Sequence, residues 1–198
     1  MKQSLTNYII QIVLIVFSVV LGLYLNGRFE DLKEKKEASK LLSKIKAELN
    51  ENKILLDSWG PYHGEIVEKL DSLSTSEQFV EDFIKDKSAI YTTFSRGTLM
   101  SDMPAADTWD IAKSHPIIVN FDYDELLALS KVYNQQKITY ESIPKLIELM
   151  LSTEFNSKDN AKQNLVLFKD KLADIYGREM QLINYYDSAN EVLNYEVK

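Results

Sequence analysis

The sequence predicts an all-α protein in which a single N-terminal transmembrane helix continues through a charged stalk into an antiparallel helical bundle. Three observations predict this class: a long uncharged apolar run near the N-terminus, apolar residues spaced three and four apart through most of the remainder, and no strand pattern of comparable length. We expect about four long helices and one long irregular crossover. The predicted parts are a short tail (1–7), the transmembrane helix (8–25), the stalk (26–37) and the bundle domain (38–198).

Composition excludes several classes of function. The chain has 198 residues, with 23 basic and 30 acidic side chains and a net charge of -7, so it lacks the basic excess that binding to nucleic-acid phosphates requires. It contains no cysteine and only two histidines, which removes thiolate catalysis, cysteine-ligated metals and most histidine-based schemes. We therefore predict no catalytic residue, no metal, no cofactor and no nucleic-acid partner.

The anchor is predicted from residues 8–25, which are almost wholly apolar and lie within a longer stretch, Gln3 to Gly27, without a charged side chain. A helix of this length spans ~27 Å, close to the ~30 Å hydrocarbon core of a bilayer. A cleaved secretory signal is the alternative, and it requires a small-x-small cleavage site. The run ends in Leu23-Tyr24-Leu25, which offers no such site. A retained helix embedded in the lipid bilayer is therefore favoured.

One stripe of the anchor is suited to contact with another helix. Gln11, Ser18 and Gly22 recur along one face. A glutamine in lipid seeks a hydrogen-bonding partner, and small residues four apart permit close approach of two backbones. The stripe predicts a contact with another membrane protein or with a second copy of the chain. The alternative is chance, because small residues are common in spanning helices.

After the stalk, an apolar seam that includes Asn52 predicts a helix from Ala38 to Trp59. Gly60-Pro61 should end it, because glycine permits a left-handed cap and proline cannot continue the hydrogen-bond ladder. A second helix, with His63 on its apolar face, should then run to Leu73. The sequence Ser74-Thr75-Ser76-Glu77 has the pattern of a capping box that opens a short third helix.

Residues 88–121 are predicted to form the irregular crossover, with a short helix at 105–114, and residues 116–119 could be a short extended piece. The run Asp122-Tyr123-Asp124-Glu125 has the pattern of another capping box, and Pro144 should kink or split the helix that follows it. A loop at 153–159 and a last long helix at 160–194 complete the predicted domain.

Familiar metal-site patterns fail on this sequence. A di-iron bundle requires Glu-x-x-His, but glycine and alanine stand three residues before the two histidines. Asn120, Asp122 and Asp124 match the first ligands of a calcium loop, yet Glu125 occupies the position that needs glycine. Helix capping explains these acids better than calcium does.

Trp109, His115 and Tyr133 are the candidate lining of a small-ligand pocket between helices. Packing is the more common role of such aromatic residues, and the end of a short helix is itself a favourable place for a histidine. Both interpretations of the three residues follow from the sequence.

Several blocks of the chain resemble an uncharacterised family of short bacterial proteins that have an N-terminal transmembrane anchor and a helical extramembrane domain. The matching blocks are the apolar run 12–26, Ala47-Glu48-Leu49-Asn50-Glu51-Asn52, and the segments 108–113, 122–126 and 132–136. The resemblance covers roughly residues 10–140. It implies an anchored helical domain and carries no activity or catalytic residue.

The membrane side of the domain is open to two interpretations. Five basic residues follow the anchor within 28–40, and their number favours a cytoplasmic domain, although acidic residues alternate with them. Members of the family usually have a longer basic tail before the spanning helix, which implies a periplasmic domain; this chain has only Lys2 there. We expect a single-pass protein of the bacterial inner membrane with a periplasmic domain, and a cytoplasmic domain is the alternative.

These observations predict a membrane-anchored helical interaction or scaffolding module, an accessory subunit of a membrane or envelope complex without catalysis. The alternative is a sensor-like helical domain that binds a small ligand near Trp109, His115 and Tyr133 and signals through a partner.

Overall fold

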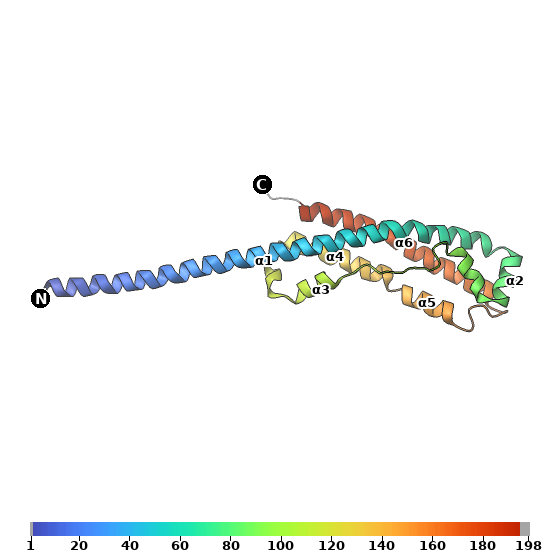
Figure 1. The fold of residues 1–198 in the computed structure, drawn as a ribbon, viewed down its shortest axis with the longest axis horizontal. Helices are drawn as coiled ribbons and strands as arrows, with labels where there is room; N and C mark the ends of the chain where they lie inside the picture. Colours follow the sequence, from blue (N-terminus) through green and yellow to red (C-terminus); the bar gives the residue numbers. More distant parts are fainter. Residues whose placement is uncertain (1, 195–198) are drawn as a thin grey trace.

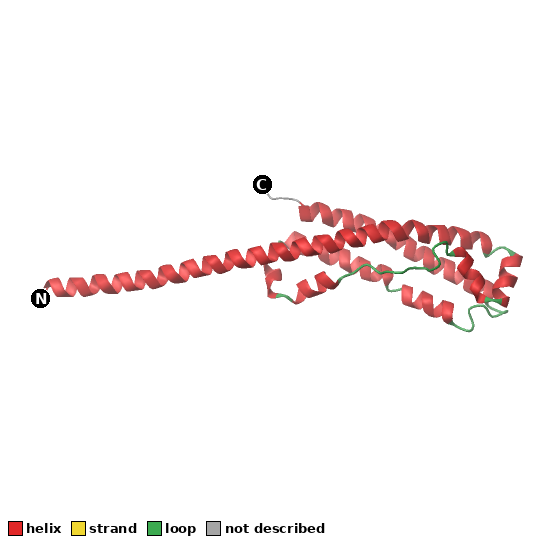
Figure 2. Ribbon diagram, viewed as in Figure 1, coloured by secondary structure: helices red, strands yellow, loops and turns green. Residues whose placement is uncertain are grey.

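A computed structural model describes the backbone of residues 2–194 and the side chains of residues 7–194. Within that range the ordered elements are all helices and no strand occurs, which confirms the all-α part of the predicted fold class (Figure 2). The elements are α1 (Lys2–Leu73), α2 (Glu77–Lys85), the 3-10 helix η1 (Lys87–Thr93), α3 (Asp107–Ser114), the 3-10 helix η2 (Pro116–Asn120), α4 (Tyr123–Tyr140), α5 (Ile143–Leu151) and α6 (Ala161–Asn194).

Helix α1 is 72 residues long, and its N-terminal half projects far beyond the rest of the molecule (Figure 1). All side chains from residue 7 to residue 37 are exposed, and Ala38 is the first buried one. From there Ile45, Leu49 and Leu56 have no exposed surface. One continuous helix therefore contains the apolar segment, the stalk and a central element of the domain core.

The predicted helix end at Gly60-Pro61 is wrong, because α1 continues through both residues to Leu73. A proline inside a helix costs about 3 kcal/mol. Two neighbours of this proline, Trp59 and Tyr62, are at most 6% exposed, and the burial of a large apolar side chain contributes about 1.5–3 kcal/mol. Packing thus outweighs the local signal. Gly60 serves close approach and not a cap, since an added Cβ would lie 2.7 Å from Met180 Cε of α6.

Helix α6 runs antiparallel to the C-terminal half of α1. Near the stalk Lys53 Nζ lies 3.0 Å from an oxygen of Asp187, and at the far end Lys169 Nζ lies 2.7 Å from an oxygen of Asp71. Helix α4 packs against α6. Only α1, α4 and α6 are longer than ten residues in the described part of the chain, so the predicted four long helices are not confirmed. The first two predicted helices, on either side of Gly60-Pro61, are both parts of α1.

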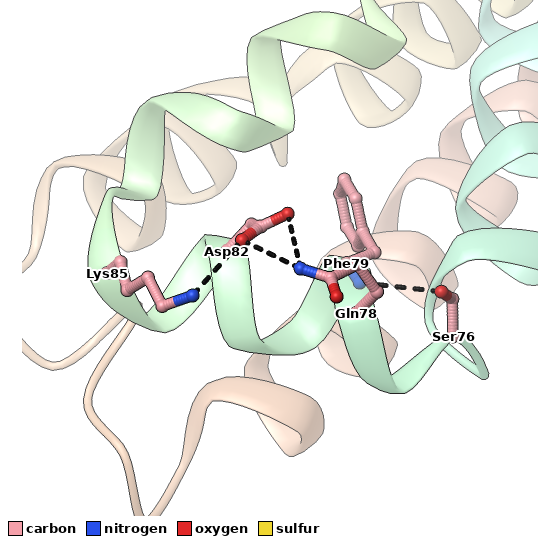
Figure 3. Close-up of polar contacts among 5 residues, drawn as sticks. All are labelled: Ser76, Gln78, Phe79, Asp82 and Lys85. Atoms are coloured by element: carbon pink, nitrogen blue, oxygen red, sulfur yellow. Dashed lines mark hydrogen bonds and ion pairs between the residues drawn. The ribbon is translucent and has the colours of Figure 1, made fainter.

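Helix α2 begins two residues later than the predicted capping box implies. Ser76 caps it, since its Oγ accepts a hydrogen bond from the Phe79 N–H at 3.4 Å, whereas Ser74 lies in the preceding turn (Figure 3). On the exposed side of α2, Gln78 donates to both oxygens of Asp82 at 3.1 Å, and Lys85 Nζ lies 3.4 Å from one of them. These contacts, the one with Gln78 first, lower the pKa of Asp82.

The remaining segments follow the sequence signals more closely. Asp122 and Glu125 form the predicted capping box of α4, with the Asp122 N–H 3.1 Å from a Glu125 carboxylate oxygen. The predicted split occurs between α4 and α5, with Pro144 in the first turn of α5. Residues 116–120 form a 3-10 helix and not an extended piece. Residues 94–106, which we call the strap, form no helix and run along the domain between η1 and α3 (Figure 2).

Candidate functional site

The first candidate site is the apolar half of α1. In the described part of the chain this is the one helix with a stretch long and apolar enough to cross a membrane. None of that stretch is buried against the rest of the chain. Gln11, Ser18 and Gly22 are all exposed. The Ser18 hydroxyl donates to the Leu14 carbonyl at 2.8 Å, and a Cβ on Gly22 would meet nothing within 4 Å. The stripe is therefore unoccupied by the rest of the chain.

The predicted pocket trio is only partly brought together. The rings of Trp109 and Tyr133 stack with centroids 5.5 Å apart at 7°, and each residue is 6% exposed. Both border a cleft of about 490 Å³ between α3, α4 and the strap, which Met103 also lines. His115 lies outside this cleft, is exposed, and accepts a hydrogen bond from the Ile117 N–H at 3.2 Å on Nδ1. His115 thus caps η2, and its placement in the pocket is wrong.

Buried polar side chains hold the start of the strap on the domain. The strap has no ladder of its own, so its backbone groups need other partners. Tyr62 Oη donates to the Thr98 carbonyl at 2.6 Å, and His63 Nε2 donates to the Leu99 carbonyl at 3.0 Å. Gly97 has a φ of 73°, a conformation that glycine adopts without steric cost, just before these contacts.

The end of the strap is held by two amides. Asn52 of α1 pairs with both backbone groups of Ala105: its Nδ2 donates to the carbonyl at 2.7 Å, and its Oδ1 accepts from the N–H at 2.8 Å. Gln136 of α4 donates to the carbonyls of Pro104 and Ala105 at 3.0 Å each and accepts from the Tyr186 hydroxyl at 2.5 Å. Because both amides are buried, water does not replace these bonds.

Next to them, Glu48 joins α1 to α3 and α4. Its two oxygens accept from the Tyr133 hydroxyl at 2.6 Å and from the Thr108 N–H at 2.8 Å. The second contact places a carboxylate at the N-terminus of α3, where the helix dipole favours negative charge. Burial first, and then the hydrogen bond to Glu48, raises the pKa of Tyr133, so this phenol remains a donor at neutral pH.

His63 and Glu179 form a pair without any exposed surface, with Nδ1 2.8 Å from Oε2. Because Nε2 donates to a carbonyl, the pair shares one further proton between Nδ1 and Oε2, as imidazolium with carboxylate or as imidazole with carboxylic acid. Glu179 Oε1 and the Tyr140 hydroxyl are buried without a hydrogen-bond partner among the described residues. Burial, and then the charge of Glu179, raises the pKa of Tyr140. Trp59 stacks over His63 with ring centroids 6.0 Å apart.

Apolar periodicity predicts His63 and Asn52 on inward helix faces but does not indicate that Glu48, Gln136 and Glu179 join them in one polar cluster. Nor does it indicate a second cleft of about 730 Å³ between the start of α4 and the end of α6, whose apolar lining is Tyr123, Leu127, Ala128, Val132, Tyr185, Ala189 and Val192. The available signal for that cleft was the apolar Leu127 and Val192 outside the predicted inward set.

No family model, no curated protein and no solved structure matches this chain. The resemblance to an uncharacterised bacterial family therefore stays a prediction from the sequence blocks that carry it.

Proposed function

We propose that this protein is a single-pass membrane-anchored interaction or scaffolding module, an accessory subunit of a membrane or envelope complex that holds its helical domain at a set distance from the bilayer and does not itself catalyse a reaction. The membrane is the bacterial inner membrane, and the domain lies on the periplasmic side. The domain is a helical unit built around the C-terminal half of α1, against which α6 packs in the antiparallel direction.

The observation that carries the proposal is the continuity of α1. Its exposed apolar segment and its buried core positions belong to one unbroken helix. From Leu25 to Ala38 a helix rises ~20 Å, so the domain stands clear of the lipid. A displacement of the anchor by a partner would therefore move the domain core as well, because no flexible joint separates them.

Three measurements test the proposal. The chain should stay in the membrane pellet after alkaline carbonate washing, and its mature N-terminus should precede residue 25. Purification in mild detergent should yield a stoichiometric membrane partner or an oligomer. Protease added to spheroplasts should digest the domain. Release into the aqueous fraction, or a clean monomer in mild detergent, contradicts the proposal.

The stripe in the anchor gives a matched test of the contact. Gln11→Leu together with Gly22→Ile should lower the yield of crosslinked partner, because the change removes the amide and fills the close-approach position. Val20→Leu, on the other side of the helix, is the control and should leave the yield unchanged. Equal yields for both variants contradict a contact at this stripe.

A sensor-like domain is the second candidate, and the cleft beside Trp109 and Tyr133 is the observation that favours it. A ligand seated there would contact the strap and shift the position of α3. It should raise the free energy of unfolding by ~2.7 kcal/mol at a hundredfold excess over its dissociation constant. A small-molecule panel without any melting shift contradicts this candidate.

A further inference from the structure

The stalk presents one exposed face that combines apolar and basic side chains. We call it the outer face, and it consists of Phe29, Leu32, Lys33, Lys36 and Lys40, each of which lies three or four residues from another member of the set. Phe29 is 70% and Leu32 65% exposed. Along a straight helix Phe29 lies ~6 Å beyond Leu25, within the ~5–7 Å headgroup layer, whereas Leu32 lies ~10 Å beyond it, where water surrounds this side chain unless something covers it.

Two acidic residues of the stalk, Asp31 and Glu34, lie on the opposite, inner face, and Glu30 and Glu37 lie between the two faces. Asp31 stands seven residues before the buried Ala38, on the same side of the helix. Glu34 points to the domain, since Asn120 of η2 donates to it at 3.3 Å. Among the described residues no charged side chain of 28–40 forms a salt bridge. The three lysines of the outer face thus point away from the domain, and Arg28 and Lys35 lie beside that face.

The outer face continues the stripe of the anchor in one register. Two rows of residues, each with a spacing of seven, run along this side of α1. One row is Gln11, Ser18, Leu25 and Leu32, and the other is Gly22, Phe29 and Lys36. Together they have the a and d spacings of a coiled coil. A helix that packs on the anchor stripe would therefore meet the outer face next, without crossing the domain.

Lipid and a second copy of the chain are poor occupants of this face. Lys36 and Lys40 lie ~17 and ~22 Å beyond Leu25 along a straight helix, whereas the headgroup layer is only ~5–7 Å thick on each side. Two copies in one membrane share the same topology and would run parallel. Their lysines would then oppose each other across the seam, and like charges in such positions are destabilising.

We propose that the outer face binds a second, different membrane protein: one whose spanning helix leaves the bilayer as a continuous helix with apolar residues flanked by Asp and Glu. Phe29 and Leu32 pack into its apolar seam, and Lys33, Lys36 and Lys40 pair with its acids. This inference rests on the proposed interaction function and names the chemistry of the partner.

The test uses the full chain in its own membranes with a photo-crosslinking amino acid at Phe29 or Leu32, and at Asp31 as the inner-face control. The outer positions should give one discrete protein adduct, at least fivefold above the control. Mass spectrometry of the crosslinked peptide should find a cluster of acidic residues directly beside a spanning segment. Lys33→Glu, Lys36→Glu and Lys40→Glu together should lower the yield about tenfold, which corresponds to ~1.4 kcal/mol over three ion pairs.

A matched triple, Lys145→Glu, Lys158→Glu and Lys162→Glu, makes the same charge change on exposed positions of the domain and should leave the yield unchanged. An adduct with twice the mass of the chain, an adduct with lipid alone, a partner with a basic flank, or an unchanged yield after reversal of the stalk charges overturns the inference. If a further crosslinker at Gln11 of the anchor stripe gives a protein adduct and those at Phe29 and Leu32 give none, the inference fails and the interaction function stands. A monomer without any protein adduct removes both.

Discussion

Replacing Glu179 with leucine should destabilise the domain strongly, because it separates a buried pair. Neither Glu179 nor His63 has exposed surface, and their 2.8 Å contact is the polar link between the middle of α6 and α1. Replacement of Glu179 leaves Nδ1 of His63 buried against an apolar side chain without a hydrogen-bond partner. Removal of one member of a buried pair costs ~3–5 kcal/mol, a fifth or more of the ~5–15 kcal/mol that stabilises a domain.

The double variant His63→Leu with Glu179→Leu separates the pair from the packing around it. Each single change should cost ~3–5 kcal/mol, but the double change leaves only the Leu99 carbonyl without its donor, a loss of ~1–3 kcal/mol. The two single costs should therefore exceed the double cost by several kcal/mol. Such a difference is the signature of direct coupling between two residues.

The assay is urea unfolding of the full chain in mild detergent, followed by tryptophan fluorescence. The chain has two tryptophans, Trp59 and Trp109, and both are buried in the domain at 6% exposure. The signal therefore reports the domain and is blind to the anchor helix. Single variants that lose less than ~1 kcal/mol, the range of surface changes, or costs that simply add in the double variant, would refute the reasoning.

Three further predictions use the same assay. Asn52→Leu should cost ~1–3 kcal/mol because it leaves the Ala105 N–H unpaired and the Ala105 carbonyl with Gln136 as its one remaining donor, whereas Asn50→Leu, on the exposed side of the same helix, should stay within ~0.5 kcal/mol; equal effects contradict the role of the strap. Gly177→Ala should stabilise by ~0.5–1 kcal/mol through helix propensity, since its Cβ meets nothing within 4 Å. Gly64→Ala should gain less, because its Cβ would lie 3.1 Å from Tyr176 Cζ; a larger gain at Gly64 would show that α1 and α6 are not closely packed there. In alkaline solution the domain should lose stability as the pH rises above about 10, because the pKa values of Tyr133, Tyr140 and Tyr186 are raised in the folded state and unfolded tyrosines ionise first. Tyr133→Phe should reduce that slope while lowering stability at pH 7, where Glu48 loses a donor; an unchanged slope contradicts the burial of this phenol.

The parts of the fold that sequence signals predict well are those with local causes. The capping box at Asp122 and Glu125 acts within one helical turn, and Pro144 ends the preceding helix through its own ring and missing N–H. The apolar run of α1 is likewise a property of consecutive residues. Each of these signals is contained in a stretch of the chain shorter than the helix that it concerns, so it can be identified without knowledge of the tertiary structure.

Gly60-Pro61 shows where local signals fail. The same dipeptide would end an isolated helix, and the sequence has no means to indicate that the terminal methyl of Met180, 120 positions away, packs directly against Gly60. The prolyl residue itself is exposed, so water can reach the carbonyl that it leaves unpaired. A helix-breaking pair thus becomes a packing position once α6 lies against it.

The polar cluster is harder to predict from the sequence, because several of its side chains bind backbone groups of the strap. Polar residues on an apolar helix face, such as Asn52 and His63, are visible in the sequence, but their partners are backbone groups of a segment without any pattern of its own. A buried strap needs donors and acceptors from its surroundings, since a buried unpaired backbone group costs ~1–3 kcal/mol. A polar residue that interrupts an apolar seam therefore predicts a non-helical segment crossing that seam, and this inference can be drawn from a sequence even when the identity of the segment cannot.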